Sequence, residues 1–74
     1  MPTIDLTATG ANIAALLRNA GLTAADVADR MGFSSRNAVY KWLKGEALPT
    51  LDNMVILADM LGVSVDDILK IRRI

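Results

Sequence analysis

The sequence has no cysteine and no histidine among its 74 residues. Without cysteine there is neither a disulfide framework nor a thiolate metal site, and without histidine the usual zinc ligand and general base are missing. No nucleophile–base pair or phosphate-cradling glycine loop takes their place. We therefore expect no enzyme activity, no metal, no cofactor and no small-molecule substrate. A chain of this length has room for one hydrophobic core, so residues 1–74 are expected to form a single domain.

Aromatic residues make up only 4% of the chain, whereas hydrophobic residues make up 53%. The aliphatic majority favours close-packed helices over a sheet. No apolar run approaches the roughly 18 residues needed to cross a bilayer. Near the start, Asp5, Thr7 and Thr9 interrupt the apolar positions, and no basic residue precedes them. The pattern predicts no secretion signal and no membrane partner, and we expect a soluble, cytoplasmic protein.

Net charge is zero, but the charges are unevenly distributed. From Arg30 to Lys44 every charged residue is basic, whereas every charged residue from Glu46 to Leu69 is acidic. The first of these segments is a candidate for contact with phosphate, and the second is not.

Hydrophobic periodicity and capping residues predict five short helices and no strand-like alternation. The first helix ends near Ala20, with Asp5, Thr7 and Thr9 as competing starts. Two capping boxes are expected, Thr23 with Asp26 and Ser64 with Asp67. The basic residues Lys70, Arg72 and Arg73 then fall at the carboxyl end of the last helix, where cations suit the helix dipole. The expected helices cover residues 7–20, 24–31, 35–44, 51–61 and 65–72. This is an all-α fold, a compact bundle.

The second and third helices are separated by only a few residues around Gly32 and Phe33, with Ser34 and Ser35 as candidate caps. So short a turn makes the helices cross steeply and pushes the third helix outward. A protruding helix fits the major groove of DNA, where Arg reads guanine and Asn reads adenine. The candidates for base-edge contact are Ser35, Arg36, Asn37, Tyr40 and Lys41. The candidates for phosphate contact are Thr23, Ser34 and Lys44.

At this point the sequence resembles the Cro/CI-repressor type of helix-turn-helix, also called the XRE family. The resemblance covers nearly the whole chain and rests on Gly21-Leu22-Thr23, Ala28, Gly32-Phe33-Ser34-Ser35, Val39, Trp42, Gly45, Pro49, Leu57-Ala58, Leu61-Gly62-Val63 and Asp67-Ile68-Leu69. It implies a lambda-repressor-like domain of five helices, with the helix-turn-helix in helices 2 and 3 and DNA binding by the third. The function expected is that of a sequence-specific transcriptional regulator, such as a repressor, that binds double-stranded DNA as a homodimer.

Three departures from the family pattern concern the DNA contact. Ala24 stands where many members have a phosphate-binding glutamine, so that contact is weaker or comes from backbone amides. Glu46 occupies a loop position that is often basic. The turn is one residue longer, which leaves the register of the base-reading residues open by one.

Several residues have competing interpretations. A charged helix face such as Arg36, Asn37 and Lys41 is often only solvated, and Tyr40 fits either packing or a phosphate contact. Trp42 follows Val39 by three positions and is predicted to lie in the core. Leu57, Ile56 and Ile74 are hard to bury in so small a bundle, so some of them are expected to form an exposed apolar patch, which fits a dimer interface. The alternative function is a protein-interaction module of the same fold, antitoxin-like or anti-repressor, with weak or no DNA binding.

Overall fold

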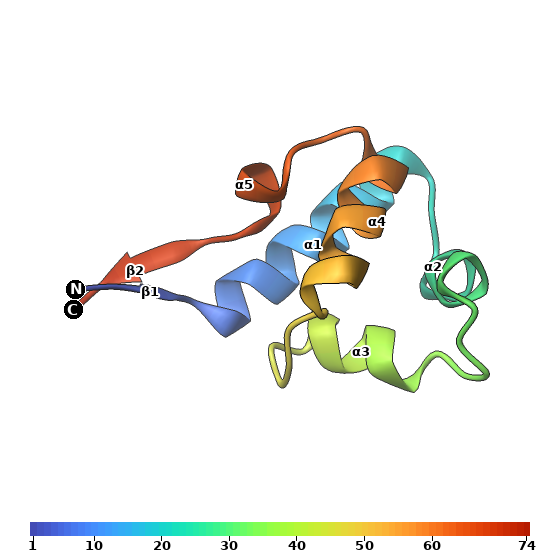
Figure 1. Ribbon diagram of the computed structural model, residues 1–74, viewed down its shortest axis with the longest axis horizontal. Coiled ribbons are helices and arrows are strands. Elements are labelled where there is room, and N and C mark those ends of the chain that lie inside the picture. The colour runs from blue at the N-terminus through green and yellow to red at the C-terminus, as the bar shows by residue number, and fades with distance from the viewer.

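A computed structural model describes residues 1–74. Five helices pack around one core, and a two-stranded ribbon formed by the two ends of the chain projects from it (Figure 1). In chain order the elements are β1 (Pro2–Ile4), α1 (Leu6–Ala20), α2 (Ala24–Met31), α3 (Asn37–Leu43), α4 (Leu51–Leu61), α5 (Val65–Ile68) and β2 (Ile71–Arg73). The five-helix architecture predicted from the sequence is confirmed.

Local capping chemistry determines where most helices begin. Of the three candidate starts for α1, Asp5 is the N-cap, and its Oδ1 accepts a hydrogen bond from the Ala8 amide at 2.9 Å. Both predicted capping boxes are present, Thr23 with Asp26 at α2 and Ser64 with Asp67 at α5. Helices α1, α2 and α4 each end at a glycine in the left-handed conformation, which a residue with a Cβ adopts only with strain.

Helix α3 begins later than the residue 35 expected from the sequence. Its first residue is Asn37, and its N-cap, Arg36, makes no side-chain capping bond. Phe33, which follows the end of α2, packs its ring edge-on against Trp42, with the ring centroids 5.9 Å apart. The chain therefore uses Ser34 and Ser35 to reach the start of α3, and these serines lie in the turn. Ser35 Oγ still accepts a 3.3 Å bond from the Asn37 amide.

The end of the chain corrects the sequence prediction, because the expected helix over 65–72 stops at Ile68. Leu69 is extended, and residues 71–73 form β2, which pairs antiparallel with β1 in the register Pro2↔Arg73, Thr3↔Arg72 and Ile4↔Ile71. The buried Thr9 Oγ1 accepts the Lys70 amide at 2.9 Å, and Asn12 Nδ2 donates to the carbonyls of Asp67 and Ile68. These α1 side chains satisfy backbone groups that a continuing helix would have used, so the chain leaves the helix there.

The core lies between the five helices. Its buried members are Ile13, Leu17, Val27, Ala28, Val39, Trp42, Met54, Leu57, Ala58 and Ile68. Trp42 is buried as predicted. Of the three residues considered for an exposed apolar patch, Leu57 has no exposed surface, because α4 contacts α1, α2 and α5 around it. Ile56 is partly buried, and Ile74 is exposed.

Candidate nucleic-acid interface

Helix α3 is held against the body from one side only. Val39 and Trp42 enter the core, and Gly10 of α1 lies so close to α3 that an added Cβ would be 2.4 Å from the Trp42 carbonyl oxygen. Because one face of α3 is fixed inward in this way, the opposite face must point outward. That face carries Asn37, Tyr40, Lys41 and Lys44, which follow one another at helical spacing.

All of the residues predicted for DNA contact are exposed. The base-edge candidates fall into two groups, because Asn37, Tyr40 and Lys41 lie on α3, whereas Ser35 and Arg36 lie in the turn before it. Of the phosphate candidates, Ser34 is in the same turn, Lys44 is the C-cap of α3, and Thr23 is the N-cap of α2. The structure thus brings the candidates onto α3, the turn that precedes it and the first residue before α2.

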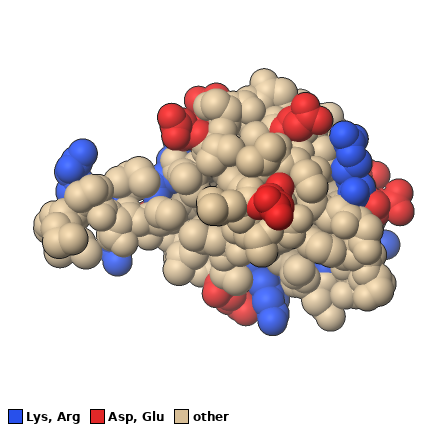
Figure 2. All heavy atoms as spheres, in the orientation of Figure 1, with Lys and Arg blue, Asp and Glu red and all other residues tan.

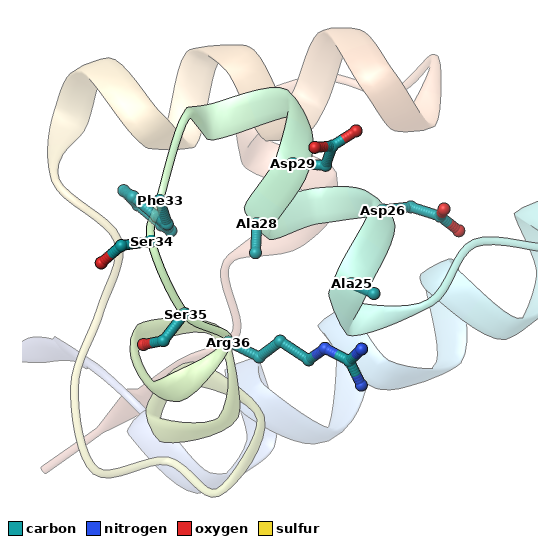
Figure 3. A pocket seen from close by; sticks show the side chains of 8 residues that line it. All are labelled: Ala25, Asp26, Ala28, Asp29, Phe33, Ser34, Ser35 and Arg36. Atoms are coloured by element: carbon teal, nitrogen blue, oxygen red, sulfur yellow. The ribbon is translucent and has the colours of Figure 1, made fainter.

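A hollow of about 360 Å³ lies between α2 and the turn that leads into α3. Its lining residues are Ala25, Asp26, Ala28, Asp29, Phe33, Ser34, Ser35 and Arg36. In Figure 3 the Arg36 side chain runs beneath the first turn of α2 and ends near Ala25, pointing away from Ser35. The guanidinium therefore lies close to the amino end of α2, where unpaired backbone amides and the helix dipole attract anions.

Two carboxylates share this region with Arg36, those of Asp26 and Asp29, and the sequence predicts a role only for Asp26, as a cap. The Thr23 amide and hydroxyl both donate to Asp26 Oδ2, at 2.8 and 3.0 Å, and lower the pKa of that carboxyl. Asp26 is therefore ionised at neutral pH, and the Thr23 hydroxyl is engaged within the capping box. Asp29 lines the same hollow. The sequence feature that could have placed both carboxylates on one exposed face of α2 is their separation of three residues.

No ion pair neutralises Arg36. In residues 1–74 the one salt bridge joins Arg30 to Asp59, at 3.5 Å on the surface between α2 and α4. Arg36, Lys41 and Lys44 are thus free to meet a partner's negative charge. Figure 2 shows one face of the molecule, with acidic and basic side chains interspersed over the helical body.

The structure contains neither a metal-binding cluster nor a membrane-spanning helix. No group of three or more histidine, cysteine, aspartate or glutamate residues is arranged to hold a metal ion. None of the helices has the length and apolar character that crossing a bilayer requires.

Comparison with known proteins decides the family. A family model described as helix-turn-helix matches residues 13–68, which run from α1 to the end of α5 and include the whole of α2 and α3. This chain belongs to the helix-turn-helix family, of the Cro/CI or XRE type. The resemblance inferred from the sequence is confirmed. Membership places this helix-turn-helix domain among DNA-binding regulators and not among enzymes.

Individual relatives agree with this assignment. The cryptic phage CTXphi transcriptional repressor RstR of Vibrio cholerae is 41% identical over 46 residues, which are 62% of this chain and 40% of that protein. The match therefore spans less than half of the repressor's length. The restriction-modification controller protein C.AhdI from Aeromonas hydrophila superposes with a TM-score of 0.76 at 25% identity, covering 86% of this chain and 96% of C.AhdI.

A second solved structure supports the fold alone. The DNA-binding domain of BldD has a TM-score of 0.72 at 24% identity and covers 89% of this chain and 94% of that domain. The shared fold includes most of the present chain in both structural comparisons.

Proposed function

We propose that this helix-turn-helix domain is a sequence-specific transcriptional regulator whose α3 enters the major groove of its DNA site. The observation that carries the proposal is the outward face of α3, where Asn37, Tyr40 and Lys41 are exposed while Val39 and Trp42 hold the opposite face in the core. An amide and a cation one turn apart match the groups that read adenine and guanine edges. Homology to a transcriptional repressor supports the same function.

The turn before α3 is suited to a phosphate contact, in contrast to the base-reading face of α3. Arg36 extends towards the amino end of α2, so its guanidinium and the nearby amides form a site suited to a phosphate. This contact offsets the lack of a polar side chain at Ala24. Lys44, exposed at the other end of α3, is suited to a second phosphate. The role of Arg36 as a base reader is the alternative to this arrangement.

We further propose that two copies bind one operator. A single module of this size buries only about 600–1,000 Å² of its own surface on DNA, which limits its affinity. Two copies related by a twofold axis would place their α3 helices in successive major grooves, about 34 Å apart. The expected operator is therefore a palindrome with two half-sites.

The test begins with selection of a preferred duplex from random DNA, followed by titrations of the wild type, Arg36→Ala and Lys41→Ala over a range of salt concentrations. Loss of a base contact costs about 1–3 kcal/mol and relaxes preference at one position, whereas loss of a phosphate contact lowers the salt slope by about 0.9 and leaves sequence preference intact. Lys41→Ala is expected to show the first pattern. Arg36→Ala is expected to show the second.

A matched control is Arg30→Ala, which removes an arginine engaged with Asp59 on the surface between α2 and α4. It should bind the duplex as the wild type does. If Arg36→Ala and Lys41→Ala both bind the duplex with wild-type affinity, the proposal that α3 and the turn before it contact DNA is wrong.

The second candidate function is a protein-interaction module, and the ionised Asp26 beside Asp29 favours it, because these carboxylates repel a phosphate backbone. The salt titration separates the two candidates. DNA binding should weaken steeply with salt, whereas an apolar protein interface should not.

A further inference from the structure

The terminal ribbon, defined as β1, β2 and the flanking Met1, Lys70 and Ile74, has no role in the interface described above. It projects beyond the amino end of α1, away from the turn between α2 and α3 (Figure 1). Met1 and Ile74 close its tip through two backbone bonds of 2.7 and 2.9 Å. A two-stranded ribbon is marginal without a partner for its faces, yet every residue of β2 is exposed. The ribbon therefore presents a surface that the fold does not use.

The charged side chains of the ribbon all have one sign. The side chains of Lys70, Arg72 and Arg73 are cationic, and none of them forms a salt bridge within the chain. The nearest acids in sequence lie at the base of the ribbon, where Asp5 caps α1 and Asp67 completes the capping box of α5, three residues before Lys70. In Figure 2 the projecting ribbon shows basic side chains and no acidic ones, in contrast to the mixed surface of the body. This concentration of positive charge points to an anionic partner.

The pleat of β2 places the two arginines on opposite faces of the ribbon. Arg73 lies opposite Pro2, and Arg72 lies opposite Thr3. Successive side chains of a strand point to opposite sides, so the guanidinium groups project in opposite directions. A ribbon that lies along a DNA groove would direct one arginine towards each of the two bounding phosphate strands.

The same residues disfavour a second copy of the chain as the partner. Met1 and Ile74 exchange both hydrogen bonds, so the next pair, Pro2 and Arg73, belongs to the class whose backbone groups face outward. Pro2 has no amide hydrogen to offer there, which blunts the free edge of β1. Antiparallel pairing of β2 with a second β2 would set arginine against arginine in the register centred on Arg72, and like charges directly opposite are destabilising.

The base of the ribbon adjoins the α3 interface. Gly45, which directly follows Lys44, packs so closely on α1 that an added Cβ would lie 2.8 Å from Thr7 Cα. The longest dimension of the molecule is 36 Å, close to the roughly 34 Å of one duplex turn. With α3 in the major groove, the ribbon can therefore reach only phosphates within about one turn of that site.

We propose that the terminal ribbon is a second DNA-contacting surface, in which Arg72 and Arg73 bind the phosphate backbone flanking the site read by α3. This inference rests on the proposed DNA binding and adds a contact outside the helix-turn-helix. It makes the flanking base pairs matter for affinity but not for sequence preference, since phosphates carry no direct sequence information.

The test combines a protein variant with a DNA truncation. Wild type and Arg72→Gln/Arg73→Gln are titrated against the selected duplex and against a version without the flanking base pairs. On the long duplex the double variant should bind on the order of tenfold more weakly, with a salt slope smaller by about 1.8. Shortening the duplex should weaken the wild type similarly and leave the variant unaffected. Circular dichroism melting checks that the variant is folded. Arg30→Gln is the control for loss of one positive charge outside the ribbon, and its response to duplex length should match that of the wild type.

Three outcomes would overturn the inference. If the double variant keeps the wild-type salt slope and the same response to duplex length, the ribbon does not contact DNA, although binding through α3 still stands. If sedimentation shows that the substitutions only change the oligomeric state, the ribbon's partner is a second copy. If selection yields no duplex bound by the wild type, the proposed function fails together with the ribbon contact.

Discussion

Gly10 in the middle of α1 controls how closely α1 and α3 approach. A Cβ at this position would lie 2.4 Å from the Trp42 carbonyl oxygen and 2.8 Å from that of Leu43. Both are backbone atoms and cannot swing aside, so α3 would have to move. The same Gly→Ala change in an open helix would be stabilising, because alanine has the higher helix propensity.

We therefore predict that Gly10→Ala lowers the free energy of unfolding by about 1–3 kcal/mol, the usual cost of overpacking, and also weakens DNA binding by displacing α3. Urea unfolding and the operator titration measure the two effects. Gly21→Ala is the control, because its left-handed backbone is strained by a Cβ but nothing lies within 4 Å of the added atom. It should cost stability without affecting DNA affinity beyond the folded fraction. Equal DNA binding by both variants would show that α3 does not depend on the Gly10 contact.

At the scale of single elements, α2 and α5 depend on their capping boxes because both are short. The Thr23 backbone amide, followed by its hydroxyl, lowers the pKa of Asp26, and the Ser64 amide and hydroxyl do the same for Asp67. A carboxyl whose pKa is lower in the folded state contributes stability above its unfolded pKa of about 3.9, and this contribution is lost as pH falls through the folded value.

Acid titration should therefore reveal both boxes. The free energy of unfolding, measured from neutral pH down to about pH 2, should fall more steeply for the wild type than for Asp26→Asn/Asp67→Asn. The variant is expected to be less stable at neutral pH and to approach the wild type in acid. Parallel curves at all pH values would mean that the boxes do not supply the pH-dependent stability. Asp52→Asn, an exposed carboxyl in the first turn of α4, serves as the control.

The third helix shows how an element's boundary follows from a distant contact. The sequence predicts an N-cap at Ser34 or Ser35, and Ser35 does accept a hydrogen bond from the Asn37 amide. The helix nevertheless begins at Asn37, because Phe33 must first reach Trp42. As a result, Arg36 lies outside the regular helix and extends towards α2. Which of its neighbours touch bases therefore stays a prediction, with the titrations above as its test.

At the scale of the whole molecule, stability rests on one small core. A domain of 74 residues has a free energy of unfolding of only about 5–15 kcal/mol, so a single cavity is a large fraction of it. Leu57 has no exposed surface, and α4, which carries it, contacts three other helices. Its side chain is thus the most consequential one on α4.

Leu57→Ala is predicted to lower the free energy of unfolding by about 2–5 kcal/mol, from lost burial and from the cavity left behind. Leu51→Ala is the matched control on the same helix, because Leu51 is 85% exposed and its truncation should change stability by no more than about 0.5 kcal/mol. Thermal and denaturant unfolding distinguish the two. Comparable losses in both variants would contradict the placement of Leu57 at the centre of the core.

The helix-turn-helix type was predictable because its signals are local. Threonine and serine caps lie within three residues of the acids they pair with, and the terminal glycines directly follow the helices. The inward positions Val39 and Trp42 follow from helical spacing alone. The exposure of Asn37, Tyr40 and Lys41 follows from the same helical spacing, whereas the other predicted contact residues lie at helix caps or in the turn before α3.

The sequence by itself thus determined five helices, most of their ends and the polar face of α3, because each depends on neighbours a few positions away. Only the tertiary structure decided the burial of Leu57, the direction of Arg36 and the conformation of the last residues. Lys70 to Arg73 read as the end of a helix, but Thr9 and the first strand, more than 60 positions earlier, supply the backbone partners that make them a strand. Hydrogen bonds between such distant residues leave no periodic trace in either segment, so the basic ribbon becomes visible only when the two ends of the chain meet.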